Sequence, residues 1–195
     1  MKIFFIILGV IISAFIAVQI YAMSIRKDSE TYPYEVVKKY ENFEIREYES
    51  RLFSTVKLDT KDYDQASREG FSILAAYIFG GNDKNEKIAM TSPVKMSLED
   101  SMTVMFMVPE DKKQEDLPNP NTSKIEFQTA PHKKVAAITF AGWASAEKIE
   151  KYKNQLIKLL KEENIAHTQN FFFLGYNPPF DVVNRRNEVI VELSQ

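Results

Sequence analysis

FEIREYESRLFSTVKL, residues 43–58, alternates apolar with polar side chains and is rich in β-branched residues, as β-strands are. IEFQTAPHKKVAAITF, residues 125–140, has the same length and carries apolar residues at corresponding places, 82 residues later. The matched pairs are Phe43 with Ile125, Ile45 with Phe127, and Val56 with Ile138. This correspondence predicts a duplicated unit that begins with extended chain in each half.

A helical period follows each stretch. DQASREGFSILAAYIF, residues 64–79, places Phe71, Leu74 and Ile78 on one face, and Gly80-Gly81 ends the helix. Ser145 can cap a second helix at the same displacement. The apolar stripe of that helix is Ile149, Tyr152, Leu156, Leu159 and Leu160.

Two further apolar runs follow each helix. KIAMTSPV at 87–94 corresponds to NFFFLGYNPPF at 170–180, and SMTVMFMV at 101–108 to NEVIVEL at 187–193. Matching Pro93 with Pro178 predicts that proline turns the third strand of each half into the fourth. The fold class is therefore α+β, a duplicated β-α-β-β unit with halves of about 43–108 and 125–193, joined by a solvated connector at 109–123.

The amino-terminal run from Ile3 to Met23 carries no charge and is long enough for a hydrocarbon core of about 30 Å. We expect residues 1–24 to form an uncleaved transmembrane helix, with a cleaved signal peptide as the alternative. Residues 25–32 are then a polar tether and 33–195 the folded domain. The short, weakly charged amino-terminal tail favours a single-pass membrane protein with its domain on the extracytoplasmic side.

The chain has 195 residues, 25 basic against 27 acidic side chains, a formal charge of −2 and no cysteine. It offers no bulk basic field for nucleic acid, no disulfide and no thiolate metal site. The two histidines, His132 and His167, lack spaced partners and are expected in solvated loops.

Two surfaces suggest chemistry. Carboxylates in predicted strands could form an acid/base pair for a hydrolase, although such residues usually line the wet face of a sheet. These are Glu44, Glu47, Glu188 and Glu192. On the first helix, Arg68, Ala75 and Phe79 share one flank, with Phe71 between that flank and the apolar centre. This flank either lets Arg68 extend to water or holds a flat apolar ligand whose acidic group meets the guanidinium.

Five motifs in this order resemble the SOUL haem-binding protein family over Tyr32 to Leu193. They are FEIREY, GFSILAAYIFGGN, EKIAMTSPV, LGYNPPF and RRNEVIVEL. The resemblance implies a pseudo-twofold, gyrase-inhibitor-like SOUL fold, with two helices on a distorted antiparallel sheet or barrel. It agrees with the repeat read from the residues.

The resemblance also implies haem or a porphyrin as the ligand, bound without covalent chemistry at an apolar groove. The residues carried over by position are Arg68, Phe71 and Ala75 on the helix and Pro179, Phe180 and Val182 on the loop. Arg68 would pair with a propionate. Ala76 replaces a lysine and Glu47 a histidine of some relatives, which leaves the metal ligand unknown: Tyr77, a methionine, or none.

The sequence thus predicts a monomeric, membrane-tethered carrier, buffer or sensor for a tetrapyrrole, rather than an enzyme. One alternative keeps the fold and changes the ligand to another amphiphile or a partner helix. The other is the hydrolase that uses a strand glutamate.

Overall fold

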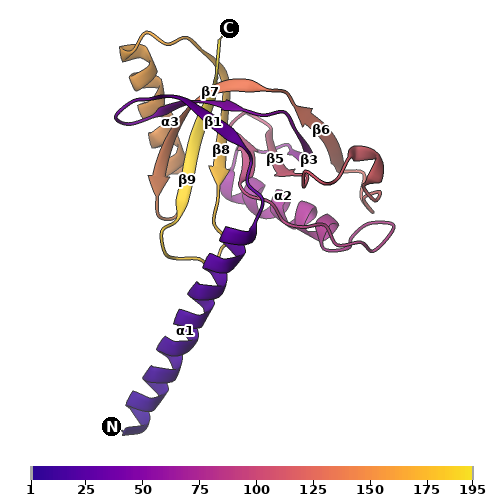
Figure 1. Ribbon diagram of the computed structural model, residues 1–195, viewed down its shortest axis with the longest axis vertical. Helices are drawn as coiled ribbons and strands as arrows, with labels where there is room; N and C mark the ends of the chain where they lie inside the picture. The colour runs from indigo at the N-terminus through magenta and orange to yellow at the C-terminus, as the bar shows by residue number, and fades with distance from the viewer. Residues whose placement is uncertain (1, 195) are drawn as a thin grey trace.

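The computed structural model describes residues 2–194, which form three α-helices and a nine-stranded sheet (Figure 1). The elements in chain order are α1 (Lys2–Asp28), β1 (Tyr34–Lys39), β2 (Glu44–Tyr48), β3 (Arg51–Leu58), α2 (Tyr63–Ile78), β4 (Val94–Ser97), β5 (Met102–Met107), the short 3₁₀ helix η1 (Gln114–Asp116), β6 (Ile125–Ala130), β7 (Lys133–Ala141), α3 (Ala146–Glu162), β8 (His167–Gly175) and β9 (Arg186–Leu193).

The sheet has pseudo-twofold symmetry. Its strand order is β1-β2-β7-β9-β8-β4-β5-β3-β6, and every pair is antiparallel. If β2, β3, β4 and β5 are exchanged with β6, β7, β8 and β9, the order from β2 to β6 maps onto itself in reverse, with the β4–β8 pair at the centre. The duplicated unit is confirmed, and β1 is an additional edge strand.

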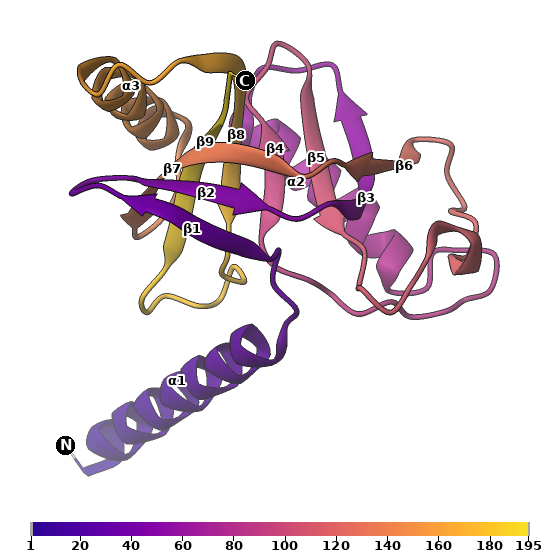
Figure 2. The ribbon, with the colours of Figure 1, turned by 45° about the horizontal axis from the view of Figure 1, so that its top comes forward.

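Each long stretch that defines the repeat is divided into two strands. Glu49 and Ser50 separate β2 from β3, and Pro131 and His132 separate β6 from β7. The first strand of each pair lies near one end of the sheet order and the second near the other. The two ends must therefore approach each other, and the sheet curls into a half-barrel (Figure 2).

Helices α2 and α3 cover one face of the curled sheet, and their apolar stripes form the main core with it. The caps hold both helix starts: Asp62 accepts a hydrogen bond from the Gln65 amide, and Ser145, as predicted, from the Lys148 amide. A second apolar cluster, which includes Tyr48, Phe53 and Phe172, fills the inside of the curl.

Gly70 sets how closely α2 approaches the sheet. A Cβ atom at this position would lie 2.4 Å from Cγ2 of Val104 on β5, a residue with no exposed surface. The missing side chain is therefore the reason that the helix can pack directly on this strand.

The role predicted for Pro93 is wrong. Pro93 comes immediately before β4, and residues 98–101 connect β4 to β5, whereas Pro178 follows β8 and lies in the connection to β9. That later connection, residues 176–185, is longer than its counterpart. Matching Pro93 with Pro178 therefore aligned the third strands of the two halves, β4 and β8, incorrectly.

Helix α1 projects away from the domain, and nearly all of its large apolar side chains are exposed (Figure 1). It continues to Asp28 and so takes in half of the expected tether. The chain that follows is fixed to the domain, because the Tyr32 amide donates to the Ser92 carbonyl and the Ser92 amide to the Glu30 carbonyl. The segment Lys2–Ser24 is long and apolar enough to span a membrane.

Candidate functional site

A groove of about 700 Å³ lies between α2, the β8–β9 connection and the residues that precede α3. This volume is in the range of small-molecule and cofactor sites. Its walls combine aromatic and aliphatic side chains with two arginines. The lining residues are Tyr63, Asp64, Ser67, Arg68, Phe71, Ser72, Val94, Met96, Trp143, Ala144, Phe173, Gly175, Asn177, Pro179, Arg185 and Asn187.

Three of the six predicted ligand contacts line this groove: Arg68, Phe71 and Pro179. The Arg68 Nε donates to the Asp64 carbonyl at 3.2 Å, and its exposed guanidinium has no ion-pair partner among the described residues. Phe71 remains 37% exposed, although its ring makes an edge contact with Phe106. A flat ligand could thus cover one face of Phe71 and reach the Arg68 charge.

The other three predicted contacts lie beside the groove. Ala75 is half-buried against the main core, one turn beyond Phe71. The ring of Phe180 lies nearly parallel to that of Tyr21 on α1, 6.5 Å away, and the Val182 amide donates to Gln19. A ligand-binding role for all six residues stays a prediction.

The sequence interpretation missed Trp143 and Arg185. The Arg185 guanidinium lies over the Trp143 ring, 4.0 Å from its centroid, and donates to the Pro178 carbonyl at 3.0 Å. Its buried Nε has no hydrogen-bond partner in the described chain, and burial lowers the pKa of Arg185. The groove therefore has a second cationic wall, held in place by the loop backbone.

The β8–β9 connection is held by α1. Gln19, which is buried, donates to the Phe180 carbonyl and accepts from the Val182 amide, both at 3.0 Å. About two turns further along the helix, Arg26 pairs with the fully buried Asp181 at 3.1 Å. The wall of the groove that carries Pro179 and Arg185 is thus fastened to the end of the apolar helix.

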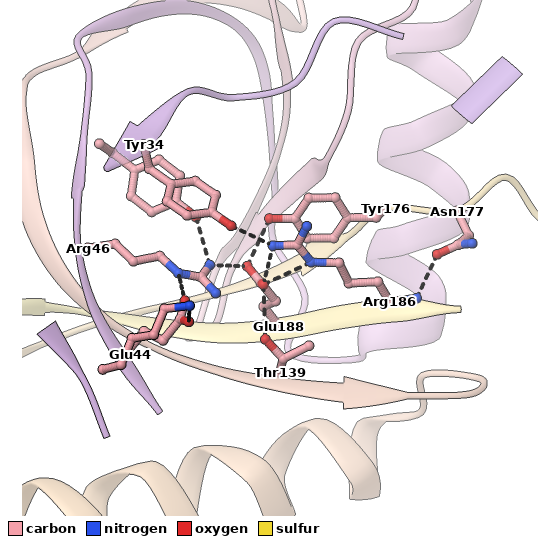
Figure 3. Close-up of polar contacts among 10 residues, drawn as sticks. Tyr34, Glu44, Arg46, Thr139, Tyr176, Asn177, Arg186 and Glu188 are labelled. Carbon is pink, nitrogen blue, oxygen red and sulfur yellow. Dashed lines mark hydrogen bonds and ion pairs between the residues drawn. The ribbon is translucent and has the colours of Figure 1, made fainter. Parts of the chain in front are cut away.

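The strand carboxylates do not face the groove. Glu188 is fully buried and accepts hydrogen bonds from Arg46, Tyr176, Thr139 and Arg186 (Figure 3). Burial acts to raise the pKa of Glu188, but the contacts with the two arginines outweigh it, and the net shift is downward. A carboxylate held this way is an ion-network anchor, and it lacks the raised pKa of a general acid.

The other three glutamates predicted in strands each form an ion pair. Glu47 lies 3.7 Å from Lys134, Glu44 bonds Arg46 at 2.9 Å, and Glu192 bonds Lys133. The structure therefore brings no two of these glutamates together in a groove where a hydrolase could use them.

Metal ligation finds little support in the groove. Tyr77, a predicted axial ligand, is buried, and its hydroxyl donates to the Pro118 carbonyl at 3.0 Å, outside the lining. Tyr63 and Met96 do line the groove, whereas neither histidine does. No cluster of three or more potential ligands among histidine, aspartate and glutamate occurs within residues 2–194. The lining fits the apolar plate and acidic edge of a porphyrin better than it fits the metal.

The solved structures of similar shape share only the fold with this chain. The carboxy-terminal domain of EcmrR matches with a TM-score of 0.60 at 11% identity, covering 83% of this chain and 98% of that one. A hydrolase from Listeria innocua matches with a TM-score of 0.57 at 8% identity, covering 81% and 94%.

Sequence relatives are more informative. "Heme-binding protein 2" of Homo sapiens is 30% identical over 157 residues, 76% of each chain. "Heme-binding protein 1" of Bos taurus is 31% identical over 172 residues, 82% of this chain and 90% of the relative. The model of the SOUL heme-binding protein family matches residues 29–192. The chain belongs to the SOUL haem-binding protein family.

Proposed function

We propose that this chain is a single-pass membrane protein that binds haem or a related tetrapyrrole, without covalent chemistry, in the groove between α2 and the β8–β9 connection. The observation that carries the proposal is an apolar groove with two guanidinium groups, from Arg68 on α2 and Arg185 on the loop. A tetrapyrrole with two propionates presents an apolar plate with two acidic groups, which matches this arrangement.

Each part of the lining has a role in this proposal. Phe71, Met96 and Phe173 supply apolar surface, and Trp143 and Pro179 supply flat faces for ring contacts. Arg185 would pair with the second propionate, which Ala76 cannot do because alanine carries no charge. Haem supplies its iron when bound, but the affinity rests on the ring and the propionates, so metal-free porphyrin should bind comparably.

Membrane tethering rests on α1. If Lys2–Ser24 spans the bilayer, the contacts of Gln19 with residues 180 and 182 would bring the loop to the interface region. The exposed side chains of Phe180, Val182 and Val183 would then lie against lipid. The groove would thus open close to the membrane surface, where an amphiphilic tetrapyrrole partitions.

This placement suits a carrier, buffer or sensor that takes up its ligand from the bilayer. We further propose the extracytoplasmic side for the domain. Protease protection of the domain in sealed vesicles of known orientation tests that side.

Titration of the full chain in nanodiscs with haemin and with metal-free protoporphyrin tests the function, with empty nanodiscs as the blank. Saturable absorbance shifts with both are expected, and Arg68→Glu should weaken binding by about 1 to 3 kcal/mol. Lys158→Glu on α3, where Lys158 forms an exposed ion pair with Glu162 one turn further along the helix, is the charge-matched control. No saturable shift with either ligand, or equal affinity of Arg68→Glu and Lys158→Glu, would overturn the proposal. A colourless purified protein that carries lipid would favour another amphiphile.

A further inference from the structure

Strand β4 sends alternate side chains to opposite faces of the curled sheet. Met96 points to the tetrapyrrole groove, whereas Lys95 and Ser97 line a separate cavity on the inside of the curl. Lys95 is 3% exposed, and within the described chain it has neither a hydrogen-bond nor an ion-pair partner. A buried ammonium group without a counter-charge is costly, so its presence calls for an explanation.

The immediate surroundings of Lys95 are aromatic. Its Nζ lies 4.0 Å from the ring centroid of Phe172 and 5.5 Å from that of Phe53. Cation–π contacts compensate part of the lost hydration but supply no negative charge. The two rings therefore hold the ammonium group in place and leave its charge unmatched.

The charged groups that face Lys95 do not neutralise it. Lys133 on β7 lies at the same cavity and is ion-paired with Glu192, which also accepts from the Asn170 side chain. Glu99 is at the exposed rim. Burial, followed by the charge of Lys133, lowers the pKa of Lys95 to about 8, with Glu192 acting in the opposite direction. Because Lys133 is already paired with the Glu192 carboxylate, the positive charge of Lys95 remains uncompensated in the cavity.

The cavity has the size and the polar groups of a small-ligand site. Its volume is about 230 Å³, comparable to roughly eight water molecules. Phe53, Phe172 and Lys95 form its buried floor, and Gln128 and Thr129 are at the exposed rim. Ser97 accepts from the Thr103 amide at 2.8 Å, which leaves its hydroxyl hydrogen free to donate into the cavity.

We propose that this cavity is a second binding site, for a small monocarboxylate with a short apolar or aromatic body, whose carboxylate pairs with Lys95. A single negative charge is specified because one positive charge is unmatched. The apolar body is specified because Phe53, Phe172 and Met105 line the space beside the ammonium group. This site lies on the opposite face of β4 from the groove and does not depend on tetrapyrrole binding.

Benzoate is a suitable probe, with benzyl alcohol as its neutral counterpart of similar shape. Calorimetric titration of the full chain in nanodiscs at neutral pH should show saturable binding of benzoate with a Kd of about 1 mM or tighter, and at least tenfold weaker binding of benzyl alcohol. Lys95→Met should abolish benzoate binding. Lys134 follows Lys133 in the sequence, pairs with Glu47 and does not line the cavity. Lys134→Met is therefore the control and should leave benzoate binding unchanged.

The pH dependence gives a test that needs no variant. Benzoate affinity of the unmutated chain should fall by about tenfold or more between pH 7 and pH 10, since Lys95 loses its proton in this interval. Absence of benzoate binding, equal binding of the two probes, binding that persists in a folded Lys95→Met variant, or affinity that is constant with pH would each overturn the proposal.

Discussion

The Nη1 of Arg46 lies 2.8 Å from Oε2 of Glu188, and the two side chains are 3% and 0% exposed. The pair joins β2 of the first half to β9 of the second across the intervening strand β7. Arg186 and Tyr176 complete the shell of the carboxylate (Figure 3). The ion network therefore ties the two halves of the repeat together inside the sheet.

Glu188→Gln should destabilise the fold by about 3 kcal/mol, because Arg186 loses its carboxylate partner and the buried Arg46 keeps only the partly exposed Glu44 among the described residues. Denaturant unfolding of the full chain in detergent micelles measures this. Glu47→Gln removes an exposed ion pair instead and should cost less than about 1 kcal/mol. Equal effects of the two substitutions would contradict the role given to the network.

The lowered pKa of Glu188 also gives a pH signature. Its stabilising contribution is complete above the pKa of the unfolded chain and is lost as the pH falls toward the folded-state value. The stability difference between the unmutated chain and Glu188→Gln should therefore shrink in acid.

Periodicity in the sequence predicted the helices, most strands and the duplicated unit, because each depends on a local pattern of burial. Periodicity gave the wrong role for Pro93. The two halves share the pattern of apolar residues but differ in the length of the connection between the third and fourth strands, which the pattern does not reveal. Periodicity also placed Arg68 and Phe71 correctly on one side of α2, where a helical face decides the position.

Loop residues had no such signal. Trp143 and Arg185 come together only through the tertiary fold, from the segments before α3 and before β9. Lys95 has the appearance of an ordinary polar residue in an alternating strand. Its burial follows from the curling of the sheet, which turns the outward face of β4 into an interior.

Gly70→Ala should destabilise the protein by about 1 to 3 kcal/mol, although helix propensity alone favours alanine by about 1 kcal/mol. The added methyl group would meet Val104, so either β5 or α2 must shift. Ser72→Ala, at an exposed position of the same helix, is the control. Because the two effects have opposite signs, a stabilising Gly70→Ala would refute the close packing of α2.

Lys95→Met should stabilise the fold at pH 7 by up to about 3 kcal/mol, which corresponds to the gap between the ordinary lysine pKa and the folded-state value of about 8. As the pH rises, the folded chain loses the Lys95 proton before the unfolded chain does. The destabilisation caused by the buried ammonium group is therefore complete below pH 8 and disappears as the pH rises toward 10.5. Denaturant unfolding of both chains across this range, in carboxylate-free buffer, should show the difference closing. A difference that is constant with pH would rule out a buried ammonium group.

Trp143 is the single tryptophan of the chain and lines the groove. Haem bound there should quench its fluorescence strongly and saturably, with the same midpoint as the absorbance titration. Trp143→Phe should remove the signal while absorbance still reports binding, weakened by about 1 kcal/mol for the lost aromatic area. Quenching without saturation would place the ligand elsewhere.

Asp181 does not line the groove, yet it should control affinity as a positioning residue. It accepts from Arg26 on α1, from the Asn177 side chain and from the Val183 amide, and it has no exposed surface. Asp181→Asn should loosen the β8–β9 connection and weaken haem binding about tenfold, or about 1.4 kcal/mol.

Arg26→Gln breaks the same ion pair from the side of α1 and serves as the matched variant. Both substitutions should raise amide hydrogen exchange in residues 176–185 and leave exchange in α3 unchanged. If Arg26→Gln alters neither exchange nor affinity while Asp181→Asn alters both, Asp181 acts only within its own loop. In that case the Arg26 ion pair would have no part in shaping the groove, and the two Gln19 hydrogen bonds would be what fastens the loop to α1.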